Sequence, residues 1–516
     1  MARRRAEPSI LLGPILYFRG EQRDRWWLSA LFVLDGEIEP DDLRVDGVTL
    51  PVPPRHLTVW RRRHVWRFDF AVPRGMRDTD VAYGFPDGPR WTMVVPGRHS
   101  FPRMAILYGS GMTGATNRAA DGIGVDGVGA DGGAPPTAPA PAPALWPDLL
   151  AAHSADRYHL LIQAGGQVDG DAVLASAPQA ASLLSDASRR LGPPLPSVAE
   201  ELISAGFDRM LRGWSGAAAA AVLASIPSVM MWDGSDLGRL LAGAWGGRED
   251  GDAASRSLRP LLVATRRQAQ LFQTGSVADS PPDCLWGAAC GTLAQGFVMG
   301  EAGLLALDLW TDRNARRILS ERDWSLLPDW LDRFAACRHL ILVSGAPLLV
   351  PAAAALDRLG AVLPPPLQRR LARRLGDHWT APGRHAEWER MLRTLADFSR
   401  RTGCRITVAS RGLSGAGGRG VLRGGGLEMW QLYAPRFAVS PSAAIRPDWR
   451  SRLAEPLATR PDHPLPAHRF EMPPFTNGGR RLLHGSGWIA CSFDGKGQLH
   501  ARWCLPTDAG RYAQAI

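Results

Sequence analysis

The sequence has 516 residues, 45% of them hydrophobic and 21% charged, which is typical of a soluble globular protein with room for two or three domains. The formal net charge is +10, and all but one of the 60 basic residues are arginines, because Lys496 is the single lysine. This bias favours a GC-rich coding sequence over a specific nucleic-acid surface, and it leaves a weak preference for anionic partners.

Cysteines and apolar runs exclude two further classes of protein. The six cysteines are too sparse for a disulfide scaffold, and none forms a CxxC pair of the kind that binds zinc. No segment is long and apolar enough to span a bilayer. Pro8, Gly13 and Pro14 interrupt the N-terminal region where a signal peptide would be continuously apolar. We therefore expect a cytoplasmic protein without a membrane partner.

Residues 1–104 predict an all-β domain, which we expect to be a small sandwich of the immunoglobulin or fibronectin kind. Short runs of β-forming residues alternate there with turn sequences such as Asp35-Gly36 and Pro86-Asp87-Gly88. The expected strands are Ile15–Phe18, Trp26–Val33, Leu57–Trp60, Val65–Phe70 and Trp91–Val95.

Residues 105–516 predict an α/β domain, because short apolar strands alternate with helices from Leu149 onward. A Gly/Ala/Pro/Asp-rich stretch at about 119–145 cannot bury a core, and we expect it to be a mobile loop. The expected strands are Tyr158–Ala164, Val229–Trp232, Gly303–Leu309, His339–Ser344, Cys404–Ala409 and Leu427–Leu432, and the expected helices are Val198–Ser225 and Glu387–Arg401. Near the end, Asp494-Gly495-Lys496-Gly497 predicts a hairpin between Trp488–Phe493 and Gln498–Trp503.

Four loops that follow expected strands are the natural places to look for chemistry. In open α/β sheets, binding sites form beyond the carboxyl ends of the strands. These loops are rich in glycine and serine and poor in metal-ligating side chains. They are residues 109–112 (GSGM), 165–171 (GGQVDGD), 233–237 (DGSDL) and 411–415 (RGLSG).

Several segments resemble the PhoD-like (alkaline phosphatase D) metallophosphatases over nearly the whole chain, from about Leu11 to Cys504. The similar blocks are RYHLLIQAGGQVDGD (157–171), LASIPSVMMWDGSDL (223–237), GLLALDLWTDR (303–313), CRHLILVSGAPLLVP (337–351), GDHWTAPGRHAEWERMLRTLADF (376–398), RTGCRITVAS (401–410) and GLEMWQL (426–432). The resemblance implies an N-terminal β-sandwich followed by a metallophosphatase-like domain of two packed sheets flanked by helices. It also implies hydrolysis of phosphoesters with divalent metals such as Ca, Fe, Zn or Mn.

The departures from this family fall on its metal-binding motifs, which read approximately SC-(N/D), GGDQ-Y-AD, MWDDHD and SGDVHVG. Where the family has its ligands, this sequence has glycine, methionine or serine, at Gly111, Met112, Gly166, Gly234, Ser235, Gly412 and Ser414. The family-motif positions that still match are Gln167, Asp171, Asp233 and Asp236.

Losing these ligands removes what a dinuclear phosphatase needs. Two metals roughly 3.5–4 Å apart generate the nucleophile and clamp the phosphate, and they require carboxylates and imidazoles. The remaining aspartates would supply at most a weak magnesium-type or calcium-type site. His378 and His385 are the nearest candidate replacements, although both fit exposed loop histidines better. We therefore expect no metal cofactor.

The retained aspartates also have a structural interpretation. Asp233 and Asp236 follow a strand and precede a helix, where an aspartate commonly caps the helix N-terminus, and we favour that role over cation binding. Asp171 would similarly cap a helix that begins at Ala172.

The glycine-rich segment 412–420 (GLSGAGGRG) lacks the GK[ST] ending of a phosphate-binding P-loop, and Ala416 breaks the pattern of a nucleophile elbow. It fits an emptied metal loop. Arg411 and Arg419 remain candidates for binding an anion through their guanidinium groups.

The leading hypothesis is a catalytically degenerate PhoD-like protein that binds or regulates a partner, which would be a protein or an anionic small molecule. Its scaffold segments read as foldable although the ligand positions are lost. Two alternatives stay open: an active phosphomonoesterase or phosphodiesterase with a rebuilt site, and a sensor that binds a phosphate ligand without hydrolysis.

Overall fold

The computed structural model describes residues 9–36, 39–111, 145–186, 194–248, 253–350, 379–380, 382–413, 415–437, 465, 467–475, 479–506 and 512–516. Most of the low-complexity stretch at 119–145 lies outside the described residues, as do Met112, His378 and Ser414. No helix in the described part of the chain is long and apolar enough to cross a membrane.

A sheet of ten strands runs through the described residues, with the strand order β22-β21-β20-β9-β10-β11-β1-β2-β6-β5. It contains β1 (Ser9–Gln22), β2 (Arg25–Asp35), β5 (Arg55–Trp60), β6 (Arg63–Pro73), β9 (Met104–Leu107), β10 (Leu160–Gln163), β11 (Ser228–Met230), β20 (Trp488–Phe493), β21 (Leu499–Cys504) and β22 (Tyr512–Ala515). In its centre β9, β10 and β11 are parallel, and β1 pairs in parallel with β11 through Tyr17 and Ser228.

A second sheet of eight strands in the described residues has the order β12-β13-β14-β15-β17-β16-β18, with β19 paired to β16. Its strands are β12 (Gln295–Met299), β13 (Ala302–Ala306), β14 (His339–Ser344), β15 (Arg405–Arg411), β16 (Gly417–Gly424), β17 (Leu427–Ala434), β18 (Arg469–Glu471) and β19 (Leu482–Leu483). The strands β13, β14, β15 and β17 are parallel neighbours. A smaller sheet contains β3 (Arg44–Val45), β4 (Val48–Thr49), β7 (Thr79–Gly84) and β8 (Arg90–Val95).

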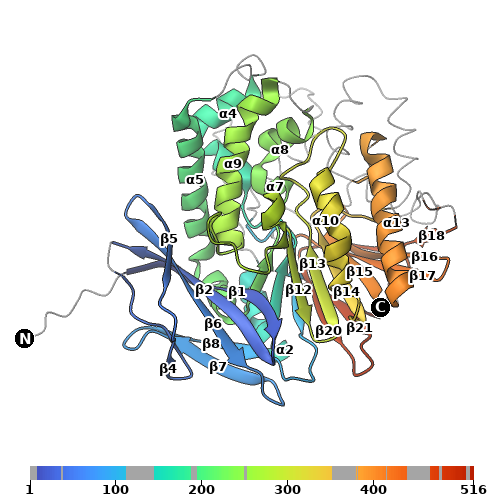
Figure 1. Ribbon diagram of the computed structural model, residues 1–516, viewed down its shortest axis with the longest axis horizontal. Coiled ribbons are helices and arrows are strands. Elements are labelled where there is room, and N and C mark those ends of the chain that lie inside the picture. Colours follow the sequence, from blue (N-terminus) through green and yellow to red (C-terminus); the bar gives the residue numbers. More distant parts are fainter. Residues whose placement is uncertain are drawn as a thin grey trace, which may run out of the picture.

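The helices of the described residues lie outside the two large sheets (Figure 1). They are α2 (Trp146–Asp156), α3 (Gly170–Ala175), α4 (Pro178–Ser185), α5 (Pro196–Trp214), α6 (Ala217–Ser225), α7 (Gly234–Leu237), α8 (Arg239–Gly246), α9 (Ala253–Gln273), α10 (Glu321–Asp332) and α13 (His385–Thr402), with 3-10 turns at η2 (Trp286–Cys290) and η3 (Pro382–Arg384). Helix α6 packs on β1, and α13 packs on β15 and β17.

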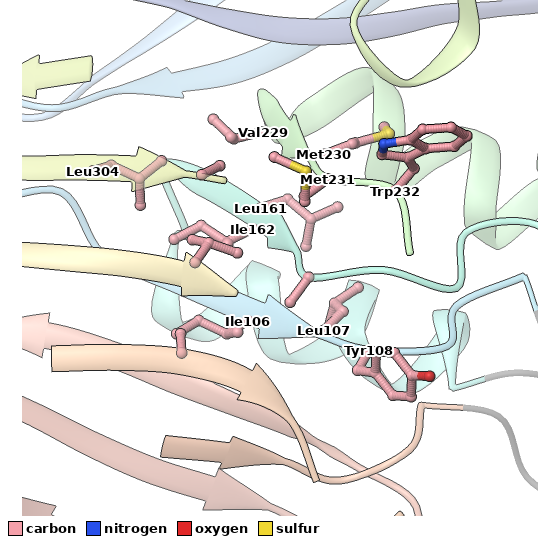
Figure 2. Packing of buried hydrophobic residues seen from close by; sticks show 14 of the residues in the cluster. Ile106, Leu107, Tyr108, Leu161, Ile162, Val229, Met230, Met231, Trp232 and Leu304 are labelled. Carbon is pink, nitrogen blue, oxygen red and sulfur yellow. The ribbon is translucent and has the colours of Figure 1, made fainter. Parts of the chain in front are cut away.

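The main core lies between the two large sheets. Phe18 of β1 stacks on Phe297 of β12 with their ring centroids 5.2 Å apart. Figure 2 shows buried side chains of β9, β10 and β11 gathered with Leu304 of β13, which is 0% exposed. Burying each such aliphatic or aromatic side chain stabilises the fold by about 1.5–3 kcal/mol. Packing between the two sheets therefore fixes their relative position, and with it the position of the loops at their ends.

The N-terminal region is β-rich, as predicted, and the rest is α/β. However, the strands of residues 1–104 divide between two sheets: β1, β2, β5 and β6 extend the ten-stranded sheet, while β3, β4, β7 and β8 form the small one. The large sheet contains strands from both sides of the predicted domain boundary at residue 104, because β1 is hydrogen-bonded to β11. The boundary itself stays a prediction.

Candidate functional site

The glycine-rich loops meet at one edge of the facing sheets. The strands β9, β10 and β11 are parallel neighbours, so the loops that follow them leave the same edge. Two hydrogen bonds join this edge to the second sheet. Trp232 Nε1 donates to Asp308 Oδ1 at 2.8 Å, and the Phe437 backbone NH donates to the Tyr108 carbonyl at 2.8 Å. Figure 2 shows Tyr108 and Trp232 beyond the ends of their strands.

Asp233 and Asp236 form a capping box around the short helix α7 (Gly234–Leu237). Asp233 Oδ1 accepts a hydrogen bond from the Ser235 backbone NH at 2.9 Å, and Asp236 Oδ2 accepts one from the Asp233 backbone NH at 2.8 Å. This arrangement satisfies helix NH groups that would otherwise lack partners. The prediction that both aspartates cap a helix is confirmed.

Asp236 also holds the neighbouring loop. Its Oδ2 accepts a hydrogen bond from the Gly166 backbone NH at 3.0 Å, and its Oδ1 accepts one from the Val168 backbone NH at 2.8 Å. Together with the bond from the Asp233 backbone NH, three of the roughly four lone pairs of this carboxylate accept hydrogen bonds from backbone NH groups. Asp236 therefore ties the β10 loop to the β11 loop and leaves little ligand capacity for a cation.

Asp171 does not cap a helix, contrary to the prediction. The N-cap of α3 (Gly170–Ala175) is Asp169, whose Oδ1 accepts a hydrogen bond from the Ala172 backbone NH at 3.1 Å. Asp171 lies in the first turn and accepts two hydrogen bonds from Arg239, from the backbone NH at 2.8 Å and from Nε at 2.7 Å. It therefore fastens α3 to the first residue of α8.

In the described residues, no group of three or more His, Cys, Asp or Glu side chains is placed to hold a metal ion. Asp171, Asp233 and Asp236 all belong to the described part, so they do not form such a group. His385 is exposed at the start of α13, where its ring packs against Trp388 with the centroids 5.3 Å apart.

The side chain of Gln167 forms a hydrogen bond within the β10 loop. Its Nε2 donates to the Gln163 carbonyl at 2.8 Å, while its Oε1 is buried without a hydrogen-bond partner among the described residues. The Gln163 side chain accepts a hydrogen bond from Ser110 Oγ at 2.7 Å, which links the β9 loop to the end of β10. Ser110 and Gln163 were not predicted to take part.

Two of the emptied positions are closed by neighbouring backbone. A Cβ atom at Gly111 would lie 1.8 Å from the Gln167 carbonyl oxygen, and one at Gly412 would lie 2.2 Å from the Ala416 carbonyl oxygen. Optimal contacts between nonbonded atoms are about 3.5–4.0 Å. A side chain at Gly111 would therefore require the β9 and β10 loops to move apart, and one at Gly412 would require its own turn to open.

A third emptied position, Gly234, is closed by an aromatic ring. Its Cβ would lie 2.5 Å from Cζ2 and 2.8 Å from Cη2 of Trp310, whose side chain is 3% exposed. At Gly166 the limit is the backbone, because its φ is +71° and non-glycine residues rarely adopt that conformation. Thus close neighbours leave no room for a Cβ atom at Gly111, Gly234 and Gly412, and backbone conformation favours glycine at Gly166.

Ser235 is the fifth of these positions in the described residues, and its side chain has a polar partner. Its Oγ lies 2.8 Å from the hydroxyl of Tyr108, so the β9 loop is also tied to α7. Tyr108 was not predicted to contribute, and an aromatic residue directly after a buried strand was the signal available.

The buried charges at this edge have perturbed pKa values. Burial raises the pKa of Asp233, and the charge of Arg411 opposes that shift. Burial, followed by the charge of Asp233, raises the pKa of Asp236, against the effect of the backbone NH donors. Burial and the charge of Asp233 raise the pKa of Tyr108 to about 12.

The two arginines that were predicted to bind an anion lie in different surroundings. Arg411, at the end of β15, is close enough to Asp233 and Tyr108 for its charge to act on both. Arg436, which was not predicted, acts on Tyr108 in the same way. Arg411 and Arg436 therefore provide positive charge at the strand ends.

Arg419 of β16 is bonded to the segment that follows β18. It is 3% exposed, its guanidinium donates to the carbonyls of Pro473 (3.4 Å) and Pro474 (2.5 Å), and it lies 4.9 Å from the centroid of the Phe475 ring. These contacts stabilise the segment that follows β18.

Asp308 is a further residue that was not predicted. Besides Trp232, it accepts hydrogen bonds from the backbone NH groups of Leu293 at 2.8 Å and Trp310 at 2.9 Å, and from Thr311 Oγ1 at 2.6 Å. Its position after an apolar strand was the available signal. Like Asp236, it is a carboxylate used to hold backbone.

Comparison with known proteins supports the fold assignment. No protein-family model and no curated protein matches this sequence. A solved structure of PhoD matches with a TM-score of 0.52 and 11% identity, over 100% of this chain and 90% of that one. A dimetal phosphatase from Danio rerio matches with a TM-score of 0.36 and 9% identity, over 81% of this chain and 99% of that one. The likeness to PhoD confirms the predicted PhoD-like metallophosphatase fold.

Proposed function

We propose that this chain is a catalytically degenerate PhoD-like protein that acts by binding a partner. The single observation that carries the proposal is the closure of the ligand positions. At Gly111, Gly234 and Gly412, even a Cβ atom would lie 1.8–2.5 Å from a neighbouring carbonyl oxygen or ring carbon. A dinuclear phosphatase needs ligand side chains and open space where these atoms pack.

The retained carboxylates support the same proposal. Asp236 accepts three backbone NH groups, Asp171 holds Arg239, and Asp233 caps α7. Each is engaged in the structure of a loop or helix. A rebuilt metal site would have to take these carboxylates from their present partners, which makes an active phosphomonoesterase or phosphodiesterase the weaker interpretation.

The preservation of the edge argues for a retained role. Tyr108, Ser110 and Trp232 each make a side-chain hydrogen bond to another loop or strand end at 2.7–2.8 Å. Buried polar groups are costly unless they are paired, so this network stabilises one loop arrangement. A surface held in one arrangement suits recognition of a partner.

A phosphate sensor is a second candidate, and one observation favours it. Arg411 and Arg436 place two positive charges near Tyr108 at the strand ends. Phosphate and nucleotides should then raise the melting temperature of the protein, and R411A should abolish that rise. A panel that leaves the melting temperature unchanged would exclude the sensor and favour a protein partner.

The proposed loss of catalysis is tested by hydrolysis. Protein purified without chelators is assayed on p-nitrophenyl phosphate and bis(p-nitrophenyl) phosphate with added Ca, Mn, Fe and Zn, and its bound metal is measured by elemental mass spectrometry. We expect no hydrolysis above the buffer rate. Hydrolysis that disappears in D233N but persists in D148N, which changes an exposed aspartate on α2, would refute the proposal.

A further inference from the structure

Two histidine side chains lie in contact on adjacent strands, away from the loops described above. His56 is on β5 (Arg55–Trp60) and His64 is on β6 (Arg63–Pro73). His56 Nε2 lies 3.2 Å from His64 Nδ1, and the ring centroids are 5.2 Å apart. In the described residues β5 is the edge strand of the ten-stranded sheet (Figure 1).

The pairing of the two strands explains why these rings meet. His56 is directly opposite Trp66, which places it diagonally across from His64 on the same face of the sheet. A register shift between His56 and Thr58 marks a β-bulge, a feature that redirects neighbouring side chains. The Trp66 ring, 4.7 Å from the His56 ring, packs against it on the inner side. Backbone register and packing therefore position the pair.

The separation of the two nitrogens fits a shared metal ion. Zinc binds imidazole nitrogens at about 2.0–2.1 Å with tetrahedral geometry, which sets two ligand nitrogens roughly 3.3 Å apart. The observed 3.2 Å matches this value. When both imidazoles are neutral and hydrogen-bonded to each other, one of the two facing nitrogens carries a proton. For both to bind a metal, that ring adopts its other tautomer, with the proton on the outer nitrogen, and no redox change is involved.

We propose that His56 and His64 together bind one divalent transition-metal ion of the copper, zinc or nickel class. Imidazole suits these metals, and copper should bind most tightly. His56 is exposed and His64 is half-buried, so solvent can reach the pair. Because the described residues provide no third His, Cys, Asp or Glu ligand here, water or an incoming ligand completes the coordination.

The surroundings set the expected strength. Arg55 and Arg63 lie next to the histidines in sequence, and Arg63 is paired with Asp208. Two neutral ligands beside basic residues should give modest affinity, weaker than a site closed by four protein ligands. Binding through both rings should nevertheless be at least tenfold tighter than binding through either one.

The test is a metal titration of the full chain, stripped with a chelator and desalted. Copper and nickel are titrated by calorimetry into the wild type, H56A, H64A and H385A, the last being a matched exposed histidine on α13. We expect one site in the wild type and in H385A, and at least tenfold weaker binding in both H56A and H64A. Copper electron paramagnetic resonance should show two coordinated nitrogens in the wild type and fewer in each strand variant.

Circular dichroism of every variant checks that the β strands still form. Wild-type affinity in either H56A or H64A would overturn the proposal, and so would an equal loss in H385A. The result is independent of the proposed loss of catalysis, because elemental analysis of the H56A/H64A double variant measures only metal bound outside the histidine pair. Metal that remains in the double variant and is lost when D233N is added would count against degeneracy without affecting the histidine site.

Discussion

Restoring a side chain at Gly234 should destabilise the protein, because the ring of Trp310 already fills the space. In G234A the new Cβ would lie 2.5 Å from Cζ2 of that ring, about 1 Å inside the optimal contact distance. The ring is held on other sides as well. The Arg313 guanidinium lies 4.4 Å from its centroid, and the Trp310 backbone NH is bonded to Asp308.

The expected cost follows from this overlap. Overpacking a buried site costs about 1–3 kcal/mol, and Gly234 does not have a positive φ that would add backbone strain. G234A should therefore lower the free energy of unfolding by about 1–3 kcal/mol. G234D, which restores the family's ligand, should lower it further because it adds a buried charge.

Urea unfolding followed by circular dichroism measures the change. The matched control is G243A, because a Cβ at Gly243 in α8 would meet nothing within 4 Å. This substitution should be neutral or stabilising by up to about 1 kcal/mol. W310F removes the outer ring atoms, so the G234A/W310F cycle should show a favourable coupling of about 1 kcal/mol or more. A fully stable G234A with zero coupling would show that the ring moves aside, and would refute the closure of this position.

Three further predictions concern the carboxylates at the strand ends. D236A removes the acceptor of three backbone NH groups, and urea unfolding should show a free energy of unfolding lower by about 3 kcal/mol or more. D171A removes a partly exposed ion pair with Arg239 and should lower it by about 1 kcal/mol or less. Equal costs for the two variants would contradict the structural role of Asp236. Folding raises the pKa of Asp233 and Asp236 above 3.8, so above about pH 4 the folded chain holds protons that the unfolded chain has released. The contribution of these two groups to the free energy of unfolding should therefore fall as the pH rises from about 4 through their raised pKa values. D233N keeps a good N-cap residue but cannot ionise, so its unfolding free energy should fall less steeply over that range, and an unchanged slope would show that Asp233 does not cause it.

Local features of the fold were predictable from the sequence, because they depend on neighbouring residues. The expected strand His339–Ser344 is β14, and the apolar spacing of Glu387–Arg401 lies within α13. The Asp494-Gly495-Lys496-Gly497 hairpin is also confirmed. Asp494 Oδ1 accepts hydrogen bonds from the backbone NH groups of Lys496 at 2.8 Å and Gln498 at 2.9 Å. Turn chemistry of this kind acts over a few residues.

Features that depend on distant partners were not predictable. The first residue of α3, Gly170, lies so close to a distant loop that a Cβ there would be 2.2 Å from the Gly238 backbone nitrogen. The bonds from Gly166 and Val168 to Asp236 span 70 and 68 positions in the sequence. The sequence predicted glycine where the resembling family has ligands, but it did not predict that neighbouring backbone or a ring would lie against those glycines.

This closure explains why the emptied site should not be recoverable by a single reversion. Each ligand side chain in a dinuclear centre keeps two loops apart and points charge into the space between them. Here Gly111 lets the β9 loop approach the backbone of the β10 loop, Gly412 lets its own turn close, and Asp236 accepts hydrogen bonds from NH groups of the adjacent loop. Restoring one ligand would break that packing without rebuilding the others. If the proposed loss of catalysis is right, closure of the loops therefore opposes the return of any single ligand.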